Sequence, residues 1–512
     1  MKRHLLIWIL MLLAMTDGWA VKVSGRLSDS VTGESLVGAY VYVEQIKTGT
    51  ATDANGVYTL DLPSTGTYSF QLVYVGYVSR TEQVTVTGDR KIDFPMEEEI
   101  NQIEEIVLEG QATRRSLAEA NIGTEKLSVM QVRKLPALMG EVDVIKAIQL
   151  LPGVQASSEG SSSYNVRGGS SDQNMVLLDQ ASVYNPSHFL GFFSVFNNDV
   201  VKDAVLYKGD IPAVHGGRLS SVMEVVTNDD VADKFTGRGG IGLITSRLLL
   251  DGPIVKDHLS VWASGRVFYA GLLLPMMSDP AIRQAGLTFY DVNSKITARI
   301  NDKHHLYLSG YVGQDFFKYE ALGRFDYSNK AATLRWAAIW RPKFVTNTYL
   351  TGSWYDFKVA GRLASLQGSW TGDIDDYGVR QEFVWTPDTH NKLKFGVSSS
   401  YKIVHTGYAE MIINDDTDPL SITIPLTTSV ESAVFASVEQ QYGRWTLKYG
   451  LRGTLFNNLD SAQNNCYYWN LEPRAGVAWR FYENMSLKAG YSRTTQYLHQ
   501  IKTTTAGTPM DL

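Results

Sequence analysis

Apolar and polar residues alternate along most of the chain after residue 237. In the stretch RWTLKYGLRGTLF, single small or polar residues separate Trp445, Leu447, Tyr449 and Leu451. A period of two predicts β-strands that have one apolar face and one polar face. We expect about twelve such strands, at roughly residues 237–250, 258–269, 293–301, 304–315, 331–341, 344–357, 376–386, 391–404, 430–441, 444–456, 470–482 and 484–496.

The connections between these strands are alternately short and long. Short ones lie at residues 301–303 and 341–343, and long ones at 272–292, 358–375 and 405–430. Strands of about ten residues joined in this way are typical of a transmembrane β-barrel, whose apolar faces meet lipid and whose polar faces line a wet lumen. A soluble sandwich would show the same period, so the alternation alone leaves that alternative open.

Two other patterns precede this region. Residues 21–98 contain short alternating runs separated by turn signals such as Asn55-Gly56, which predict an N-terminal β-sandwich. Residues 111–228 mix strand-like runs with a helical pattern that ends at Leu151-Pro152-Gly153, as proline and glycine favour. The expected fold is therefore mainly β, with a β-sandwich, an α+β domain and an antiparallel transmembrane β-barrel over residues 237–512.

The N-terminus has the features of a secretory signal peptide. Lys2 and Arg3 precede an apolar run over residues 5–15, and Gly18-Trp19-Ala20 places small residues before a cleavage site. The apolar run is too short to cross a bilayer comfortably. We predict that residues 1–20 are removed and that the mature protein lies outside the cytoplasm.

Charge and residue usage argue against several classes of function. Basic and acidic residues number 47 and 53, the net charge is −6, and no long basic run is present, so we expect no nucleic-acid partner. The single Cys466 supplies neither a disulfide framework nor a thiolate metal site. The histidines form no H-x-x-E or H-E-x-x-H pattern. His304 and His305 would point to opposite faces of a strand, which favours a solvated pair over a metal site. We expect no enzyme, no catalytic residue, no cofactor and no resident metal.

An acidic connector over residues 99–110 contains the stretch EEIVLEG. One interpretation is a solvated linker that carries a small apolar patch. The other is a segment captured by another protein as an added strand, because Ile106, Val107 and Leu108 form a short extended run after Glu105. The flanking charges would oppose self-aggregation of that run.

Two sets of motifs carry resemblances to known families. The stretches VSGRLSDSVTGESLVGAYVYVE and GTATDANGVYTLDLP make residues 21–98 resemble the carboxypeptidase regulatory-like domain, a β-sandwich without catalytic residues of its own. LPGVQ, NVRGGSSDQNMVLLDQASVYNPSHFLGFFSVFN and VKDAVLYKGDIPAVHGGRLSSVMEV make residues 111–228 resemble the plug domain of TonB-dependent outer-membrane receptors of the Bacteroidetes type. That resemblance implies a plug seated inside a barrel.

The resemblance assigns roles to particular residues. Glu105, Ile106, Val107 and Leu108 would form the box that pairs with TonB, although EEIVLEG departs from the EEVVVTG of many relatives. Arg167 would face the lumen and seek a carboxylate partner, in preference to a ligand contact. The remaining lumen-facing plug residues, with glycines for tight turns and Asp179 as a turn residue, would be Gly168, Gly169, Asp179, Gly216, Gly217 and Arg218. Gln180 stands where the family usually has glycine, as in LLDG.

The predicted strands are too few to enclose such a plug. A barrel of twelve strands has a backbone diameter of roughly 24 Å, whereas one of twenty-two strands, the number in the resembled family, has about 44 Å. A compact plug of about 120 residues is about 35 Å across. We therefore expect an incomplete barrel of about 12 of 22 strands, in a partial sequence, a truncated gene or one half of a split protein.

The resemblance implies active uptake of a nutrient ligand across the outer membrane of a Gram-negative bacterium. The expected partners are TonB with its inner-membrane energising complex, an extracellular ligand (glycan, peptide or metal chelate) and a surface lipoprotein. The N-terminal domain would be periplasmic. A signal transducer, an adhesin-like binding protein on the same fold, and an inactive truncated receptor are the alternatives.

Overall fold

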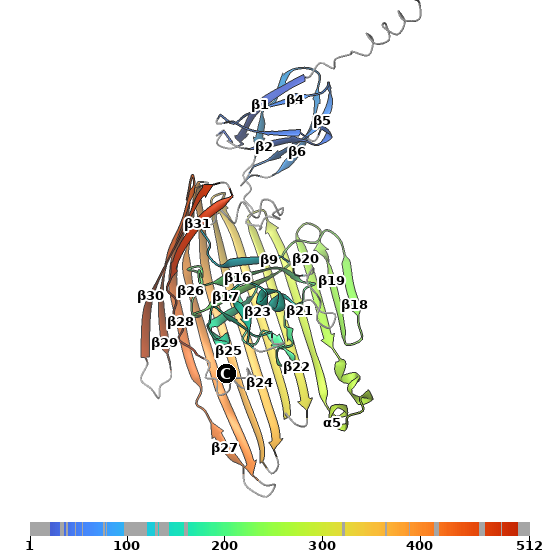
Figure 1. The fold of residues 1–512 in the computed structure, drawn as a ribbon, viewed down its shortest axis with the longest axis vertical. Coiled ribbons are helices and arrows are strands. Elements are labelled where there is room, and N and C mark those ends of the chain that lie inside the picture. Colours follow the sequence, from blue (N-terminus) through green and yellow to red (C-terminus); the bar gives the residue numbers. More distant parts are fainter. Residues whose placement is uncertain are drawn as a thin grey trace, which may run out of the picture. The chain divides into compact units, whose positions relative to one another are not determined.

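The computed structural model describes residues 21–499 except 31–34, 37–38, 47, 54, 75–76, 78, 97–119, 129–131, 133–142, 158–161, 320–322, 364–365, 389, 414–418, 460–465 and 483. The chain divides after Ile106 into two compact units (Figure 1). In the described part of the chain, no helix is both long enough and apolar enough to span a membrane.

The first unit is the predicted β-sandwich. One sheet pairs β1 with β4 and β7 and, further along, with β8; the other has the order β3-β2-β5-β6. Alternate side chains of both sheets are buried between them, and the rings of Tyr58 and Phe70 each lie about 6 Å from that of Phe94. The bounds are β1 (Val21–Asp29), β2 (Tyr40–Val43), η1 (Glu44–Ile46), β3 (Thr48–Ala51), β4 (Val57–Leu62), β5 (Gly66–Val73), β6 (Arg80–Val86), β7 (Arg90–Lys91) and β8 (Phe94–Met96).

The second unit begins with the α+β region, which we call the plug. Its five-stranded sheet has the order β13-β12-β17-β16-β9, with only the β12–β17 pair parallel. The elements are β9 (Thr124–Ser128), α4 (Val144–Gln149), β10 (Val154–Ala156), β11 (Tyr164–Val166), η2 (Ser171–Gln173), β12 (Asn174–Leu178), β13 (Ala181–Ser182), β14 (Ser187–His188), η3 (Phe189–Gly191), β15 (Phe193–Ser194), β16 (Val201–Lys208) and β17 (Ser221–Thr227).

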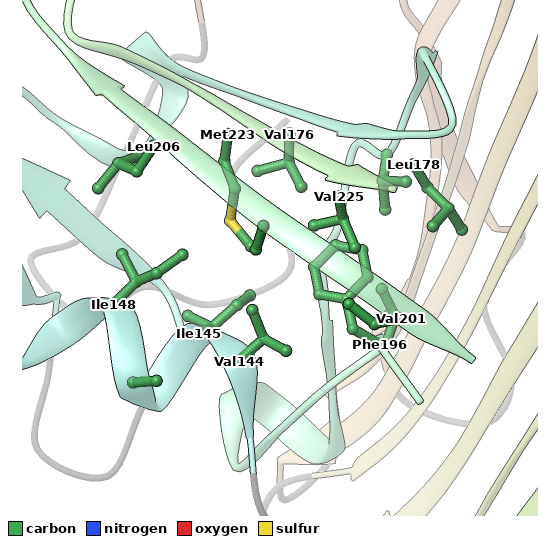
Figure 2. Close-up of a cluster of buried hydrophobic side chains, with 14 of the residues drawn as sticks. Val144, Ile145, Ile148, Val176, Leu178, Phe196, Val201, Leu206, Met223 and Val225 are labelled. Carbon is green, nitrogen blue, oxygen red and sulfur yellow. The ribbon is translucent and has the colours of Figure 1, made fainter. Parts of the chain in front are cut away.

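Helix α4 packs against the plug sheet. Its N-cap residue Asp143 accepts hydrogen bonds from the backbone N–H groups of Ile145 and Lys146 at 2.8 and 3.1 Å, which satisfies donors that a helix start leaves free. Ile145 and Ile148 of the predicted helical pattern are fully buried. Figure 2 shows them facing Met223 of β17, so an apolar core holds helix α4 against the plug sheet.

The rest of the second unit is one antiparallel sheet, which we call the wall. Its strands pair in chain order from β18 to β31, and β27 pairs only with β26. The bounds are β18 (Thr236–Ile241), β19 (Thr245–Val255), β20 (Leu259–Phe268), η4 (Ala270–Leu272), η5 (Leu274–Met276), α5 (Pro280–Arg283), β21 (Gly286–Asn301), β22 (His304–Tyr319), β23 (Gly323–Arg341), β24 (Phe344–Leu363), β25 (Leu366–Asp388), β26 (Asn391–Ile413), β27 (Leu420–Thr423), β28 (Thr427–Tyr442), β29 (Trp445–Asn458), β30 (Cys466–Tyr482) and β31 (Met485–Ser492).

The wall keeps the predicted alternation, with its apolar face outward. In β29, Leu447 and Leu451 are exposed, whereas the polar residues Thr446 and Arg452 are about 95% buried on the opposite face, which meets the plug. An exposed apolar face opposite a buried polar one is the arrangement of a strand between lipid and a filled lumen. The predicted antiparallel membrane barrel, incomplete over the described residues, is confirmed at the level of fold.

The predicted strand over residues 237–250 is wrong, because the chain reverses within it. Gly242 donates a backbone hydrogen bond to Thr245 at 2.7 Å, and this tight turn separates β18 from β19. Residues 237–242 read GRGGIG and carry no apolar–polar alternation, so the period of two could not mark where the chain reverses.

The long connections expected at residues 358–375 and 405–430 are also wrong, because most of those residues extend the strands. Strands β24 and β25 stay paired as far as Leu363 and Leu366. The 23 residues of β25 span about 76 Å, far more than the apolar band of about 25 Å that crosses a membrane. Outside that band both strand faces can meet water or protein, so the sequence there has no strict alternation.

Candidate functional site

The plug is joined to the wall by buried charged groups. His188 lies between two wall carboxylates, with Nδ1 2.6 Å from Asp315 and Nε2 2.6 Å from Asp291. Arg266 donates to the second Asp291 oxygen at 2.7 Å, and the Tyr311 hydroxyl donates to the first at 2.9 Å. The side chains of His188 and Asp291 are 1% and 0% exposed, so this cluster is shielded from solvent.

The two carboxylates keep His188 protonated. Burial by itself would lower the pKa of the imidazole, but the charges of Asp291 and Asp315 outweigh burial and raise the pKa to about 9. A protonated imidazole has two N–H donors, one for each carboxylate. The neighbouring Phe189 N–H also donates to Asp315 at 2.8 Å, which fixes the plug segment against the wall.

The predicted turn residue Asp179 forms a second link between plug and wall. Its φ is 46°, a left-handed value, at the turn between β12 and β13. One carboxylate oxygen accepts from the backbone N–H of Thr227 at 2.9 Å. The other lies 3.3 Å from Nζ of the wall residue Lys295. Asp179 therefore connects two plug strands and the wall.

Gln180 keeps the left-handed turn in spite of its side chain, with a φ of 77°. Its amide nitrogen donates to plug residue Glu224 at 2.9 Å, and its amide oxygen accepts from wall residue Arg380 at 2.6 Å. His215 lies 2.9 Å from the same Glu224 carboxylate. Burial opposes ionisation of Glu224, but His215 and the hydrogen bond from Gln180 together hold its pKa below the usual range.

The predicted residues Gly216, Gly217 and Arg218 lie where the plug meets β28 and β29. A Cβ on Gly216 would clash with the Arg452 guanidinium, and one on Gly217 would lie 3.1 Å from a Glu431 oxygen. The φ of Gly217 is 79°, which also favours glycine. Arg218 donates to the Gly217 carbonyl at 2.9 Å. Close approach of the plug backbone to charged wall groups therefore requires these glycines.

Arg167, Gly168 and Gly169 follow strand β11 of the plug. Arg167 is exposed with a φ of 49°, and its guanidinium lies beside Gly123, where an added Cβ would be 2.7 Å from a guanidinium nitrogen. No carboxylate of the described residues forms an ion pair with Arg167. Gly168 has a φ of 80° in open space, whereas a Cβ on Gly169 would crowd the Ser220 hydroxyl. Gly169 therefore lies beside Ser220, two residues after Arg218 in the chain.

A cavity of about 470 Å³ lies between the plug and the wall. The plug contributes residues 180–187 and 214–218, among others, and the wall contributes residues from β23 to β29. Within it, the Tyr184 hydroxyl of the plug donates to the Asp376 carboxylate of the wall at 2.8 Å. The cavity is therefore bounded jointly by plug and wall, with both polar and apolar side chains in its lining.

His304 and His305 separate as adjacent strand residues should. The His304 ring stacks 5.8 Å from Trp336, which is exposed on the outer face, whereas the His305 ring lies 6.5 Å from Tyr307. Over the residues that the structure describes, no group of three or more His, Cys, Asp or Glu side chains could hold a metal ion. The candidate TonB-pairing segment, residues 105–108, lies outside the described residues.

Three family descriptions match the chain in succession. They are the CarboxypepD_reg-like domain over residues 23–108, the TonB-dependent receptor plug domain over residues 124–221 and the TonB-dependent receptor-like β-barrel over residues 278–507. The order and the positions agree with the sandwich, the plug and the wall. The chain belongs to the TonB-dependent receptor family.

Two relatives from Formosa agariphila carry the same family name. TonB-dependent receptor P26 is 26% identical over 212 residues, which are 40% of this chain and 20% of the relative. TonB-dependent receptor P3 is 24% identical over 245 residues, which are 46% of this chain and 23% of the relative. The matched regions thus span about a fifth of the length of each curated relative.

Solved structures of TonB-dependent receptors share the fold. The ferric enterobactin receptor PfeA of Pseudomonas aeruginosa superimposes with a TM-score of 0.54 at 13% identity, over 75% of this chain and 63% of that protein. The iron transporter FrpB of Neisseria meningitidis gives 0.57 at 14% identity, over 74% and 66%. This barrel fold is that of an outer-membrane protein, and the chain spans just under two thirds of these receptors' length.

Sequence reasoning missed the most deeply buried plug-to-wall contact in this receptor. His188 lies inside a stretch that resembles the plug family, but nothing local to it indicates a charged cluster. Its carboxylate partners are 103 and 127 residues away in the chain. The only available signal was that Asp315 ends the predicted strand over residues 304–315. Asp291 falls in the connection expected at residues 272–292, which in the structure belongs to β21 from Gly286 onward.

Proposed function

We propose that this chain serves, within the intact receptor, in active uptake of a nutrient ligand across the outer membrane of a Gram-negative bacterium. Membership of the TonB-dependent receptor family supports the proposal. The observation that carries it is the plug held on the luminal side of the wall by side chains such as His188 and Asp179, with a cavity between plug and wall. A ligand in that cavity could cross only if the plug rearranges.

The proposed energy source is TonB, driven by its inner-membrane complex. Glu105, Ile106, Val107 and Leu108 would form the segment that TonB captures as an added strand. Backbone hydrogen bonds of such a strand resist force along the chain, so a pull on this segment would reach the plug. The sandwich domain before it would then lie in the periplasm.

The lengths of the connections support an orientation for the ligand side. The pairs β21–β22 and β23–β24 are joined by two-residue turns, and short turns face the periplasm in outer-membrane barrels. The opposite end of β22–β23 is the pair Tyr319 and Gly323. Tyr327 lies four strand positions from that end, and it lines the cavity. The cavity would therefore lie toward the extracellular side, where a ligand arrives.

A proline substitution in the intact receptor tests this proposal. Ile106→Pro removes the backbone N–H needed for strand capture, whereas Ile106→Ala keeps it and serves as the control. We expect Ile106→Pro to reduce energy-dependent growth on, or uptake of, the ligand by at least about tenfold, with surface binding retained. Equal uptake by Ile106→Pro and Ile106→Ala receptors would reject the assigned segment and its role.

The ligand class and a surface lipoprotein partner stay predictions. The names of the two solved structures speak of iron for those proteins, and we propose that the ligand here is a glycan, a peptide or a metal chelate. Co-purification of the tagged receptor from outer membranes tests the lipoprotein, which should be recovered in stoichiometric amount. We propose no enzymatic activity.

A further inference from the structure

Two acidic groups of the plug–wall cavity already have partners within the protein: Asp376 accepts hydrogen bonds, and Glu431 is paired with cations. Asp376 accepts from the Tyr184 hydroxyl at 2.8 Å and from the Ser400 hydroxyl at 2.7 Å. Glu431 lies between two wall cations, 3.9 Å from Lys402 and 4.0 Å from Arg452. A ligand that brings many N–H or O–H donors would therefore compete with bonds that the protein makes for itself.

Donor groups, in contrast, are left over in the same cavity. Tyr327 is 3% exposed, and its buried hydroxyl has no hydrogen-bond partner among the described residues. The Nε atoms of Arg218 and Arg452 are likewise buried without a partner there. No described carboxylate forms an ion pair with Arg218. A buried donor without an acceptor is costly, and an oxygen-rich ligand would satisfy it.

The charge of the lining also favours an anion. Cations outnumber carboxylates by one in the cavity, at four to three. The cations are Arg218, Arg380, Lys402 and Arg452, and the carboxylates are Asp172, Asp376 and Glu431. Arg380 already donates to Gln180 at 2.6 Å, so Arg218 of the plug is the cation most available to a ligand.

One side of the cavity is aromatic. Tyr327 and Tyr355 belong to a buried apolar cluster with Ile374, and Tyr184 of the plug packs against that cluster. All four residues line the cavity. Aromatic faces offer apolar surface with a polar tip, which suits the carbon-bound hydrogens and hydroxyl groups of a sugar ring.

We propose that this cavity binds an acidic oligosaccharide, a saccharide that carries carboxylate or sulfate groups. Its anionic group lies against Arg218, a hydroxyl or ring oxygen accepts from Tyr327, and a sugar face packs on the tyrosine cluster. The inference rests on the proposed uptake function and names its ligand class. An acidic peptide fits less well, because its backbone N–H groups need acceptors. Asp376 already accepts from Tyr184 and Ser400, and Glu431 is already paired with Lys402 and Arg452.

The test is calorimetric binding to the intact receptor purified in detergent. The probes are tetragalacturonate, its methyl ester, a heparin-derived tetrasaccharide and tetra-aspartate. We expect at least one acidic saccharide to bind, with an affinity that falls as salt is added. If the carboxylate form is the ligand, the methyl ester should bind at least about tenfold more weakly than tetragalacturonate. Preference for the heparin fragment assigns sulfate, and preference for tetragalacturonate assigns carboxylate.

Two variants locate the binding to the cavity. Arg218→Gln and Tyr327→Phe should each weaken binding of the preferred saccharide about tenfold, because each removes one donor from a buried contact. The control Arg341→Gln changes an exposed arginine at a two-residue turn and should leave affinity unchanged. Tyr327→Phe deletes a hydroxyl without a protein partner, so unfolding should be unaffected and a loss of affinity cannot be ascribed to misfolding.

Several results would overturn this inference. They are no binding of either acidic saccharide, tighter binding of tetra-aspartate, or unchanged affinity in both the Arg218→Gln and Tyr327→Phe receptors. Failure here is separable from failure of the proposed function. If Ile106→Pro still blocks uptake of another ligand, transport stands and the saccharide assignment falls. If saccharides bind through Arg218 but Ile106→Pro leaves uptake intact, the assignment stands and TonB-driven transport falls.

Discussion

The contacts of His188 with Asp291 and Asp315 should make the attachment of the plug to the wall depend on pH. The pKa is raised from 6.5 to about 9 in the folded protein, so the folded state holds the proton more tightly than the unfolded state. The stabilisation is therefore fully present below pH 6.5 and is lost as pH rises through about 9. The difference corresponds to about 3 kcal/mol. His188 is 1% exposed, so solvent does not screen this interaction.

The perturbation is His188→Gln, which keeps a polar side chain but cannot carry the charge. Asp291 would then face Asp315 with Arg266 as its remaining cation, and loss of one partner from a buried charged cluster costs about 3 to 5 kcal/mol. The control His405→Gln changes an exposed histidine 2.7 Å from Asp373, where solvent screening leaves little to lose.

Pulse proteolysis in urea, applied to the detergent-solubilised receptor, measures the stability of the plug while the barrel stays intact. At pH 6 the wild-type plug should exceed His188→Gln by at least about 3 kcal/mol, and the gap should shrink by about that amount by pH 10. The His405→Gln receptor should follow the wild type throughout. A gap between wild type and His188→Gln that stays constant from pH 6 to 10 would show that His188 holds no extra proton, and the reasoning would fail.

Further predictions concern plug backbone positions that have a left-handed φ. Gly217→Ala should destabilise the plug by about 1 to 3 kcal/mol in the same proteolysis assay, through strain at φ 79° and crowding of Glu431 at 3.1 Å. Gly168→Ala, at φ 80° in open space, should cost only the strain of about 1 kcal/mol, and equal losses would refute the contact argument. Gln180→Ala should cost about 2 kcal/mol, because alanine keeps the backbone strain and loses the hydrogen bond to Arg380. Gln180→Gly should cost about 1 kcal/mol less, because glycine relieves the strain of the left-handed φ. The reverse order in thermal unfolding would contradict this account.

Local pattern was enough to predict most of the fold. Each residue of a strand points to the side opposite its neighbours, so alternation along residues 445–455 already indicated which face would meet lipid. The same rule predicted the sandwich core, where Tyr58 and Phe70 are fully buried. The helical spacing of Ile145 and Ile148 predicted α4. These features depend only on residues a few positions apart.

The limits of the pattern are equally physical. Alternation carries no information on where a strand reverses, so the turn at Gly242 was missed. It also fades where both strand faces meet water, so the extensions of β24 and β25 were read as loops. Motif resemblance identified residues 216–218 as plug positions, but the structure was needed to explain the glycines there, through the close approach of Glu431 and Arg452 and the left-handed φ of Gly217.

The sequence by itself determined the order of domains, the β-rich fold and the lipid-facing side of the wall, because period and motif are properties of neighbouring residues. Only the tertiary structure decided which charges meet. Gln180 and Arg380 are 200 residues apart, and His188 and Asp291 are 103 apart. Such pairs exist because plug and wall dock in one register, and the energy of each buried charge depends on the partners that this register supplies.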